Sequence, residues 1–263
     1  MSARGNSLRS AVAVGNVEMV LLDLSGGCPV DDRDELGYTA LHYACRSDRL
    51  NMESICMILL DHGANSNAKT DNNVSPLHLC CLVQRPTTLN VGQESETAVE
   101  RNRKQNALIQ SKLRIIEDLL SRGADPMARD NSGVCPLHLA ANGGVPEIVR
   151  ALLIHTTVMQ PARGDRPLMF SVPYVKVCDR FGKNPAHWAI EGKQQETYFL
   201  LFLAEFGYAF EGLYDQLVEN GVVDVATIQR RFNLTTQELK LLEQFVMKYC
   251  THGDEKKRGL EDD

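Results

Sequence analysis

Histidine and cysteine side chains lie close together in the sequence, and metal binding is the first chemistry that they suggest. His78 is followed by Cys80 and Cys81. No C-x-x-C or H-x3–5-H pair occurs elsewhere to supply further ligands at the spacing that zinc sites use. We therefore expect no metal ion and no cofactor at these residues.

Acidic residues in the first part of the chain suggest a calcium site, which their spacing excludes. The segment Asp32-x-Asp34-x-Leu36-Gly37 begins like a calcium-binding loop, but Leu36 stands at the third ligand position and Tyr43 stands where a bidentate glutamate is required. The chain also lacks the G-x-S-x-G, G-x-x-x-x-G-K-[ST] and G-x-G-x-x-G motifs. The sequence thus predicts no catalytic residue, no small-molecule substrate and no enzymatic activity.

Four histidines, His78 among them, close a tetrapeptide that recurs along the chain. Its first residue can cap a helix through a side-chain oxygen, and in three copies the second is proline, which suits the first helical position because no N–H donor is needed there. Cys135 is a weaker cap and predicts a helix start less stable by about 1 kcal/mol. The copies are Thr39-Ala40-Leu41-His42, Ser75-Pro76-Leu77-His78, Cys135-Pro136-Leu137-His138 and Asn184-Pro185-Ala186-His187.

Each tetrapeptide lies in a longer frame whose parts keep a fixed order. An Asp-x-x-Gly turn precedes three copies, and small residues such as Ala44-Cys45 and Ala140-Ala141 follow. A second stretch then carries leucine and isoleucine at helical spacing. Two frames close with Gly63-Ala64-Asn65 and Gly123-Ala124-Asp125, where glycine can take the left-handed conformation that ends a helix. A recurring frame of this kind predicts a stack of similar units.

The frame resembles the ankyrin repeat family, whose units are a β-hairpin finger and two antiparallel helices of about 33 residues in all. The resemblance covers roughly residues 5–210, and the first unit departs from it because Leu8-Arg9 stands in place of Leu-His. It implies an all-α dominated repeat solenoid with short β-hairpin fingers, in which the tetrapeptide histidines brace neighbouring turns by hydrogen bonds. The expected five helix-turn-helix units are 5–36, 37–72, 73–132, 133–181 and 182–210.

Two units are longer than the period and carry insertions. The tetrapeptide histidines are separated by 36, 60 and 49 residues. The larger insertion, 84–105, is polar, and its end from Glu100 is expected to extend the following helix; it is either a tolerated surface loop or a regulatory or docking element. The smaller insertion, 157–174, is rich in proline and apolar residues, which predicts that it packs on its own stack or holds a partner.

The repeat frame stops beyond Gly207, and two further segments follow. Residues 211–250 carry apolar stripes at helical spacing and predict a helical C-terminal extension that seals the last unit. The charged segment 251–263 predicts a disordered tail. The helix pair at 224–249 leaves open a nucleic-acid-associated role, although Lys240 and Lys248 are balanced there by Glu238 and Glu243.

Composition and charge favour an ordinary folded intracellular protein. A net charge of −6 argues against a broad nucleic-acid-binding face, and no apolar run reaches the length needed for membrane insertion or secretion. Eight cysteines in a chain of this size, several at core positions, predict reduced buried thiols. We expect a cytoplasmic location, with the nucleus as a second compartment because Lys256-Lys257-Arg258 is a weak import signal.

The resemblance implies a non-catalytic protein-binding module or adaptor, with a fixed structural subunit as the alternative. Family partners bind across the fingers and the inner helix face, and apolar residues that the frame does not require are the expected anchors. Leu36, Tyr38, Leu82 and Val83 are of this kind. The expected finger contacts are Glu35, Leu36, Tyr38, Asp71, Asn72, Val74, Asn131, Ser132, Val134, Arg180, Phe181 and Lys183, and the inner-helix contacts are Arg46, Ser47, Leu82, Val83, Asn142 and Glu191.

Overall fold

A computed structural model describes residues 3–49, 51–83, 98–156, 172–194, 197–198, 200–201 and 204. The chain divides into two compact units, one of residues 1–158 and 170–206 and the other of residues 159–169 and 207–263. All the described residues belong to the first unit. The predicted helical extension 211–250 and tail 251–263 lie outside the described residues.

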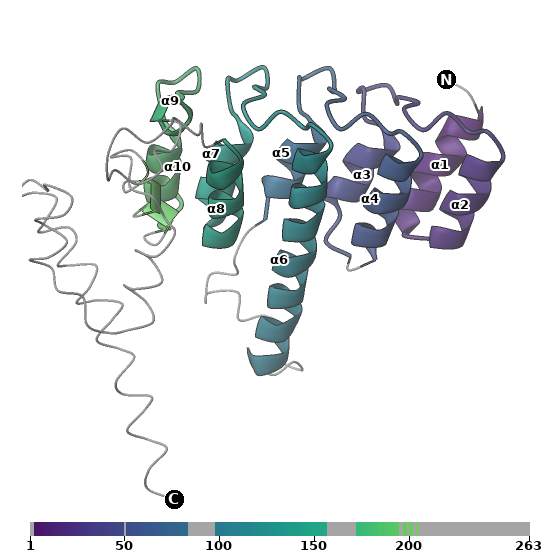
Figure 1. Cartoon of the computed structure of the whole chain (residues 1–263), viewed down its shortest axis with the longest axis horizontal. Helices are drawn as coiled ribbons and strands as arrows, with labels where there is room; N and C mark the ends of the chain where they lie inside the picture. Colours follow the sequence, from purple (N-terminus) through teal and green to yellow (C-terminus); the bar gives the residue numbers. More distant parts are fainter. Residues whose placement is uncertain are drawn as a thin grey trace, which may run out of the picture. The chain divides into compact units, whose positions relative to one another are not determined.

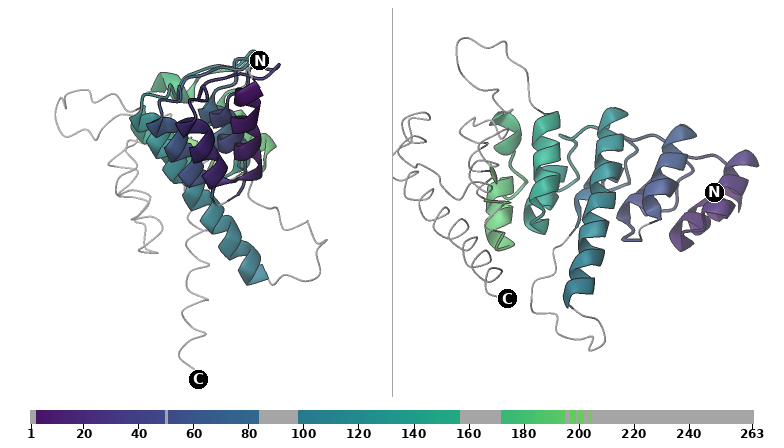
Figure 2. Two further views of the ribbon diagram at one scale, coloured as in Figure 1. Left: turned by 90° about the vertical axis from the view of Figure 1, so that its right-hand side faces the viewer. Right: turned by 60° about the horizontal axis from the view of Figure 1, so that its bottom comes forward.

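The described part of the first unit is built from helices that pair along the chain (Figure 1). Each pair joins a first helix to a second, α1 to α2, α3 to α4, α5 to α6 and α7 to α8. The first helices contact one another in order and continue to α10, and the second helices do the same from α2 to α8. Two layers of helices result, as both panels of Figure 2 show, and this is an all-α repeat fold. The helices are α1 (Ala3–Val14), α2 (Val17–Ser25), α3 (Ala40–Arg46), α4 (Met52–Asp61), α5 (Pro76–Cys81), α6 (Ala98–Ser121), α7 (Pro136–Gly143), α8 (Pro146–His155), α9 (Val172–Val175) and α10 (Pro185–Glu191).

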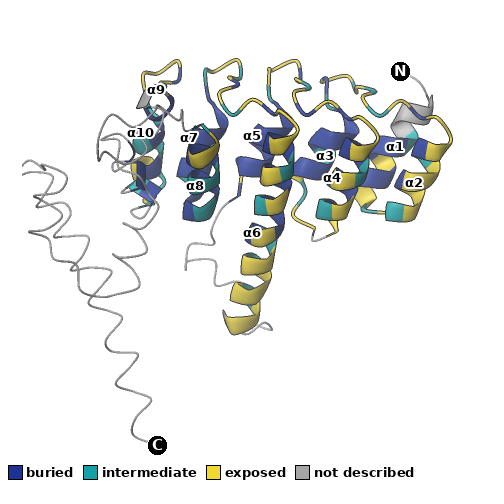
Figure 3. Ribbon diagram, in the orientation of Figure 1, coloured by how far each residue is buried: buried dark blue, intermediate teal, exposed yellow. Residues whose placement is uncertain are grey.

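The core lies between the two layers, where the leucines and isoleucines of the frame meet (Figure 3). Leu41, Leu77 and Leu137 of the tetrapeptides are fully buried. The small pairs behind them, such as Ala140-Ala141, are buried as well and allow the first helices to approach closely. Burial of this stripe on every helix supplies most of the stability, because short helices are marginal by themselves.

His42, His78 and His138 each bind their own helix start through Nδ1 and the following unit through Nε2. Nδ1 of His78 accepts a hydrogen bond from the backbone N–H of Ser75 at 3.2 Å, and Nε2 lies 3.1 Å from the carbonyl oxygen of Val134 in the following unit. His42 and His138 make the same two contacts, to Val74 and Lys183 respectively. Accepting at Nδ1 and donating at Nε2 requires a neutral imidazole with its proton on Nε2.

The first residue of the tetrapeptide touches the same ring. The hydroxyl oxygens of Thr39 and Ser75 lie 2.9 and 2.7 Å from Nδ1 of their histidines. Cys135, expected to be the weakest cap, places its Sγ 3.0 Å from Nδ1 of His138 and so takes the position of the hydroxyls. Asn184 instead caps its helix by accepting from the backbone N–H of His187 at 3.0 Å.

We expect the free energy of unfolding to fall as the pH drops below about 6.5. Burial lowers the pKa of His42, His78 and His138 in the folded chain, and hydrogen bonds to finger carbonyls offset this only in part. The unfolded chain therefore takes up protons near pH 6.5 that the folded chain does not, so stability is full above this pH and is lost below it. Each histidine contributes up to about 1.4 kcal/mol per pH unit.

Urea unfolding at about pH 7.5 and 5.5 measures this loss, and His78→Gln should reduce the difference between the two values. The pKa values of some carboxyl groups, such as those of Asp34 and Asp179, are lowered in the folded chain, so their protonation changes the free energy of unfolding only at more acidic pH. A stability that does not change between the two pH values would contradict the prediction.

The fingers are tight turns organised by an aspartate. Oδ1 of Asp130 accepts from the backbone N–H groups of Ser132 and Val134, both at 2.8 Å, and Asp34 and Asp179 organise their turns in the same way. One backbone hydrogen bond joins each finger to the next, as from Asn131 N–H to the carbonyl of Asn72 at 3.0 Å. No strand is assigned in the described part of the chain, because a single bond per neighbouring pair is too few for a β-ladder.

The expected helical extension at the end of the larger insertion is present. Helix α6 has 24 residues, against 10 in α4, and its first turns project beyond the neighbouring helices (Figure 1). Val99 in this part is 79% exposed. Residues 84–97 of the insertion lie outside the described residues.

The end of the smaller insertion packs on the stack. Tyr174 is fully buried, and its hydroxyl donates to the carbonyl oxygen of Pro126 at 2.8 Å. One of its apolar residues therefore serves the core of the unit. Residues 157–171 lie outside the described residues.

Two further expectations concern the state of the cysteine thiols and the presence of membrane-spanning helices. The described cysteines are free, and all except Cys178 are buried. Burial raises the pKa of Cys135 to about 11, so that this thiol stays protonated at neutral pH. No helix in the described ranges is both long and apolar enough to cross a membrane.

Candidate protein-binding surface

The finger turns project from one edge of the stack (Figure 1) and carry two exposed apolar side chains. Leu36 is 64% exposed and Phe181 is 82% exposed. An aspartate-organised turn holds each of them in place, because Asp34 and Asp179 accept from the N–H groups of Leu36 and Phe181. Polar exposed side chains lie along the same edge, namely Glu35, Asp71, Asn72, Asn131, Ser132 and Arg180.

Hydrogen bonds between neighbouring fingers bring these residues together in a continuous row. The N–H of Asp71 donates to the carbonyl of Leu36 at 3.1 Å, and the N–H of Arg180 donates to that of Ser132 at 2.9 Å. The row is therefore a preorganised edge of backbone turns rather than a set of independent loops, and ordering it on binding costs little.

Several residues predicted to bind a partner lie where they also serve the fold. Val83 and Val134 are 3% and 6% exposed, so their side chains face the core and are not part of the surface. Val74 is half-buried, and its carbonyl accepts from Nε2 of His42. The ring of Tyr38 packs edge-on against His42, with centroids 5.6 Å apart, and lies near Tyr43. Tyr38 thus has a packing role beside any role in binding.

The predicted inner-helix residues lie at the C-terminal ends of the first helices. Leu82 is 50% exposed, Arg46 and Glu191 are exposed, and Ser47 and Asn142 are half-buried. Glu191 accepts from Lys183 Nζ at 2.6 Å, which joins the finger to the helix in that unit. The structure therefore leaves exposed polar groups and one leucine on this face.

Two residues of the finger row were not predicted from the sequence. Arg33 donates from Nη2 to the carbonyl of Lys69 at 2.7 Å, and Asn73 donates from Nδ2 to Oδ1 of Asn131 at 2.6 Å. Asn73 has φ 58° and takes the place of the glycine in the other fingers. Alignment of the fingers could have found Asn73, because asparagine tolerates the left-handed conformation, whereas nothing in the spacing marks Arg33.

The chemistry of this surface is hydrogen bonding and apolar contact. Within the described ranges no group of three or more His, Cys, Asp or Glu side chains could hold a metal ion. Both ring nitrogens of His78 are already within hydrogen-bond distance of backbone groups, and Cys80 and Cys81 are buried. Paired helices stacked in two layers, with a row of turns along one edge, place the chain in the class of helical repeat proteins.

The repeat type follows from comparison with known proteins. Residues 8–91 and 105–210 match a family model described as ankyrin repeats (3 copies), which confirms the resemblance inferred from the tetrapeptides. The chain belongs to the ankyrin repeat family. Proteins of this family generally mediate protein–protein interactions and are generally not enzymes.

The curated relatives that are similar to this region of the chain are proteins of different kinds. The chain is similar to BCL-6 corepressor-like protein 1 of Homo sapiens, with 31% identity over 136 residues, which cover 51% of this chain and 6% of the relative. It is 29% identical over 146 residues to ankyrin repeat, SAM and basic leucine zipper domain-containing protein 1 of Bos taurus, covering 56% and 25%. It is 28% identical over 158 residues to the mitochondrial disaggregase of Bos taurus, covering 57% and 23%. The matched regions thus span a quarter or less of these relatives.

Proposed function

We propose that this chain is a non-catalytic adaptor that binds a protein partner across its finger row and inner helix face. The observation that carries the proposal is the pair of exposed apolar side chains, Leu36 and Phe181, on turns that hydrogen bonds hold in one row. Apolar side chains held on a rigid edge can be buried by a partner with little loss of conformational freedom on binding. The polar residues between them supply the hydrogen bonds that give such an interface its specificity.

We also propose that the stack has five units, the last of which combines α10 with the helical residues 197–198, 200–201 and 204. Thr197, Leu200, Leu201 and Ala204 are at most 1% exposed. Their spacing of three, one and three residues places them on one face of a helix.

The free thiols of the described cysteines support a cytoplasmic or nuclear compartment for this stack.

The double variant Leu36→Asp with Phe181→Asp should lose the partners that the unmodified chain captures. Each charge would replace an apolar anchor of the proposed interface, and the loss of such an anchor weakens binding by about 30-fold or more. Affinity capture from cells followed by mass spectrometry identifies the partners, and titration with a purified partner measures the change in Kd.

A double variant on the second helices, Leu22→Asp with Ile154→Asp, is the matched control. These side chains are 65% and 54% exposed, so the same charges are added at similar exposure but away from the fingers. Both double variants should unfold at nearly the same urea concentration as the unmodified chain. Equal loss of partners in the two variants, or no loss in either, would contradict the proposed surface.

A further inference from the structure

The tips of the four finger turns lie in register along the row. Each backbone hydrogen bond between neighbouring fingers runs from the first tip residue of one finger to the carbonyl of the second tip residue of the finger before it. These bonds join Asp71 to Leu36, Asn131 to Asn72 and Arg180 to Ser132. Two aligned series of side chains therefore follow the row, Glu35, Asp71, Asn131 and Arg180 at the first tip position and Leu36, Asn72, Ser132 and Phe181 at the second.

The charge at the first tip position changes sign along the row. Glu35 at one end and Arg180 at the other are both exposed, and neither forms an ion pair with a described residue. Between them, Asp71 lies 3.3 Å from Nη2 of Arg33, which partly neutralises it, and Asn131 is uncharged. The row therefore carries opposite charges at its two ends.

The remaining charged residues of the two end fingers are engaged within the chain. The carboxylates of Asp34 and Asp179 accept hydrogen bonds through one oxygen from their own turn and through the other from the aromatic residue that follows the tetrapeptide. Lys183 donates to Glu191 at 2.6 Å. The two tip charges are thus the ones that these fingers leave for a partner.

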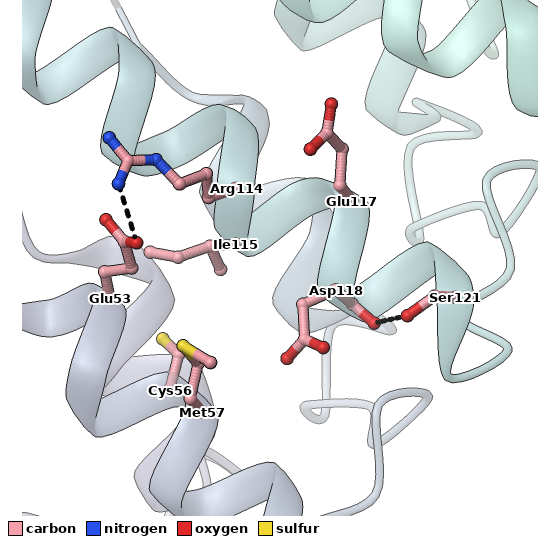
Figure 4. Close-up of a pocket in the computed structure, with 8 residues that line it drawn as sticks. All are labelled: Glu53, Cys56, Met57, Arg114, Ile115, Glu117, Asp118 and Ser121. Carbon is pink, nitrogen blue, oxygen red and sulfur yellow. Dashed lines mark hydrogen bonds and ion pairs between the residues drawn. The ribbon is translucent and has the colours of Figure 1, made fainter.

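The pocket between α4 and α6 offers a partner less than the finger row does (Figure 4). The single guanidinium that lines it, that of Arg114, already donates to Glu53 at 3.1 Å. Asp118 accepts from Arg122 at 3.1 Å through Oδ1, while its Oδ2 is buried. A partner would have to compete with these internal contacts, which the tip charges of the fingers do not require.

The second tip position is apolar at the two ends of the row and polar between them. Asn72 and Ser132 are exposed there, and their side chains form no hydrogen bond with the described residues. A helix bound in a groove needs a continuous apolar surface for its anchors, which a polar middle does not supply. An extended segment instead has backbone N–H and C=O groups that an amide and a hydroxyl can pair with. The row therefore fits an extended segment.

The stacking of the first helices sets the distance between two anchors on such a segment. Helices α3, α5, α7 and α10 contact one another in this order, and each follows one finger. Packed helices lie about 8–10 Å apart, so the first and last of these fingers are about 24–30 Å apart. An extended chain advances about 3.3–3.6 Å per residue and covers this length in about 7–9 residues.

We propose that the finger row binds an extended segment of a protein partner with two apolar residues about 7–9 positions apart, one on Leu36 beside a basic residue and one on Phe181 beside an acidic residue. This inference rests on the proposed finger surface and adds the conformation, spacing and charge order of its partner. The charges fix the direction of the segment, because the reverse direction would bring like charges together at both ends.

Selection of phage-displayed random peptides of about 16 residues, twice the required length, tests the spacing with the full chain as bait. We expect the enriched peptides to share two apolar residues at this spacing, with Lys or Arg beside one and Asp or Glu beside the other. The double variant Leu36→Asp with Phe181→Asp should not retain these peptides, because both anchor contacts are lost.

Charge reversal at one end of the row tests the charge order with a synthetic peptide from this selection. Arg180→Glu should weaken its binding about fivefold, because an exposed ion pair becomes a repulsion. Exchanging the acidic residue of the peptide for lysine should restore binding to Arg180→Glu, which no general damage to the fold would do. Arg103→Glu makes the same charge change at an exposed position of α6 and should leave the affinity unchanged.

The outcomes distinguish this inference from the finger surface on which it rests. Peptides that need Leu36 and Phe181 but share no spacing, or that bind Arg180→Glu as tightly as the unmodified chain, would overturn the inference and leave the surface in place. The inference also fails if partners captured from cells need these two residues but no selected peptide does. Where neither the captured partners nor the peptides need them, the finger surface itself is wrong.

Discussion

Replacing Gly143 by alanine should lower the free energy of unfolding by about 3 kcal/mol or more, the loss typical of a severe steric conflict in a core. Gly143 ends α7, and a Cβ atom added there would lie 2.0 Å from the carbonyl oxygen of Val83 and 3.1 Å from its carbonyl carbon. Both are backbone atoms, so no side-chain rotation can relieve the contact. At an unobstructed helix position the same change would stabilise by about 0.5–1 kcal/mol.

Gly123→Ala is the matched control for this prediction. Gly123 has φ 83°, and a Cβ atom there would meet nothing within 4 Å. Its substitution should cost about 1–2 kcal/mol, from backbone strain alone. Urea unfolding of the full chain measures both changes. If Gly143→Ala costs no more than Gly123→Ala, the close approach of α7 to the end of α5 does not exist as described.

Replacing Lys112 by alanine should lower the free energy of unfolding by about 3 kcal/mol, as for the removal of a large buried side chain. Lys112 lies on α6 and is only 2% exposed, which is rare for lysine. Its Nζ donates to the carbonyl oxygen of Cys45 at 2.5 Å and lies 3.7 Å from Oδ1 of Asp48. The side chain thus links the long second helix of one unit to the end of α3 in the preceding unit.

Two variants separate the packing of Lys112 from its charge. Lys112→Met keeps most of the side-chain volume and also removes the cost of burying an ammonium, so it should lose only about 1 kcal/mol. Asp48→Asn keeps the lysine but removes the nearby negative charge, and should destabilise the chain because the buried ammonium is then less compensated. Urea unfolding compares the three variants. A Lys112→Ala protein as stable as the unmodified chain would refute the structural role of this residue.

The features that sequence could predict are those that repeat or that act within a few residues. The tetrapeptide places a cap, a helix start and a histidine within four positions, and the structure shows three of the four histidines, His42, His78 and His138, at the junction with the next unit. The Asp-x-x-Gly turns likewise close over five residues. Short-range geometry of this kind depends on bond rotations and local hydrogen bonds, which residue type largely determines.

The candidate surface was predictable only in part, because side-chain exposure depends on neighbouring units. Leu36 and Val83 are both apolar residues that the frame does not require, yet one is exposed and the other is buried beside Gly143. Periodicity places a residue on a helix or turn but does not say which atoms of another unit will cover it.

The sequence by itself determined that this chain is an ankyrin-type stack, because period, caps and turns are encoded locally and recur. Tertiary structure alone decided that Lys112 is buried, that Asp118 Oδ2 has no donor among the described residues and that Arg114 meets Glu53 across 61 residues. The reason is physical. These outcomes depend on the offset at which α6, lengthened by its insertion, packs against the preceding unit, and no short-range pattern in the chain specifies that offset.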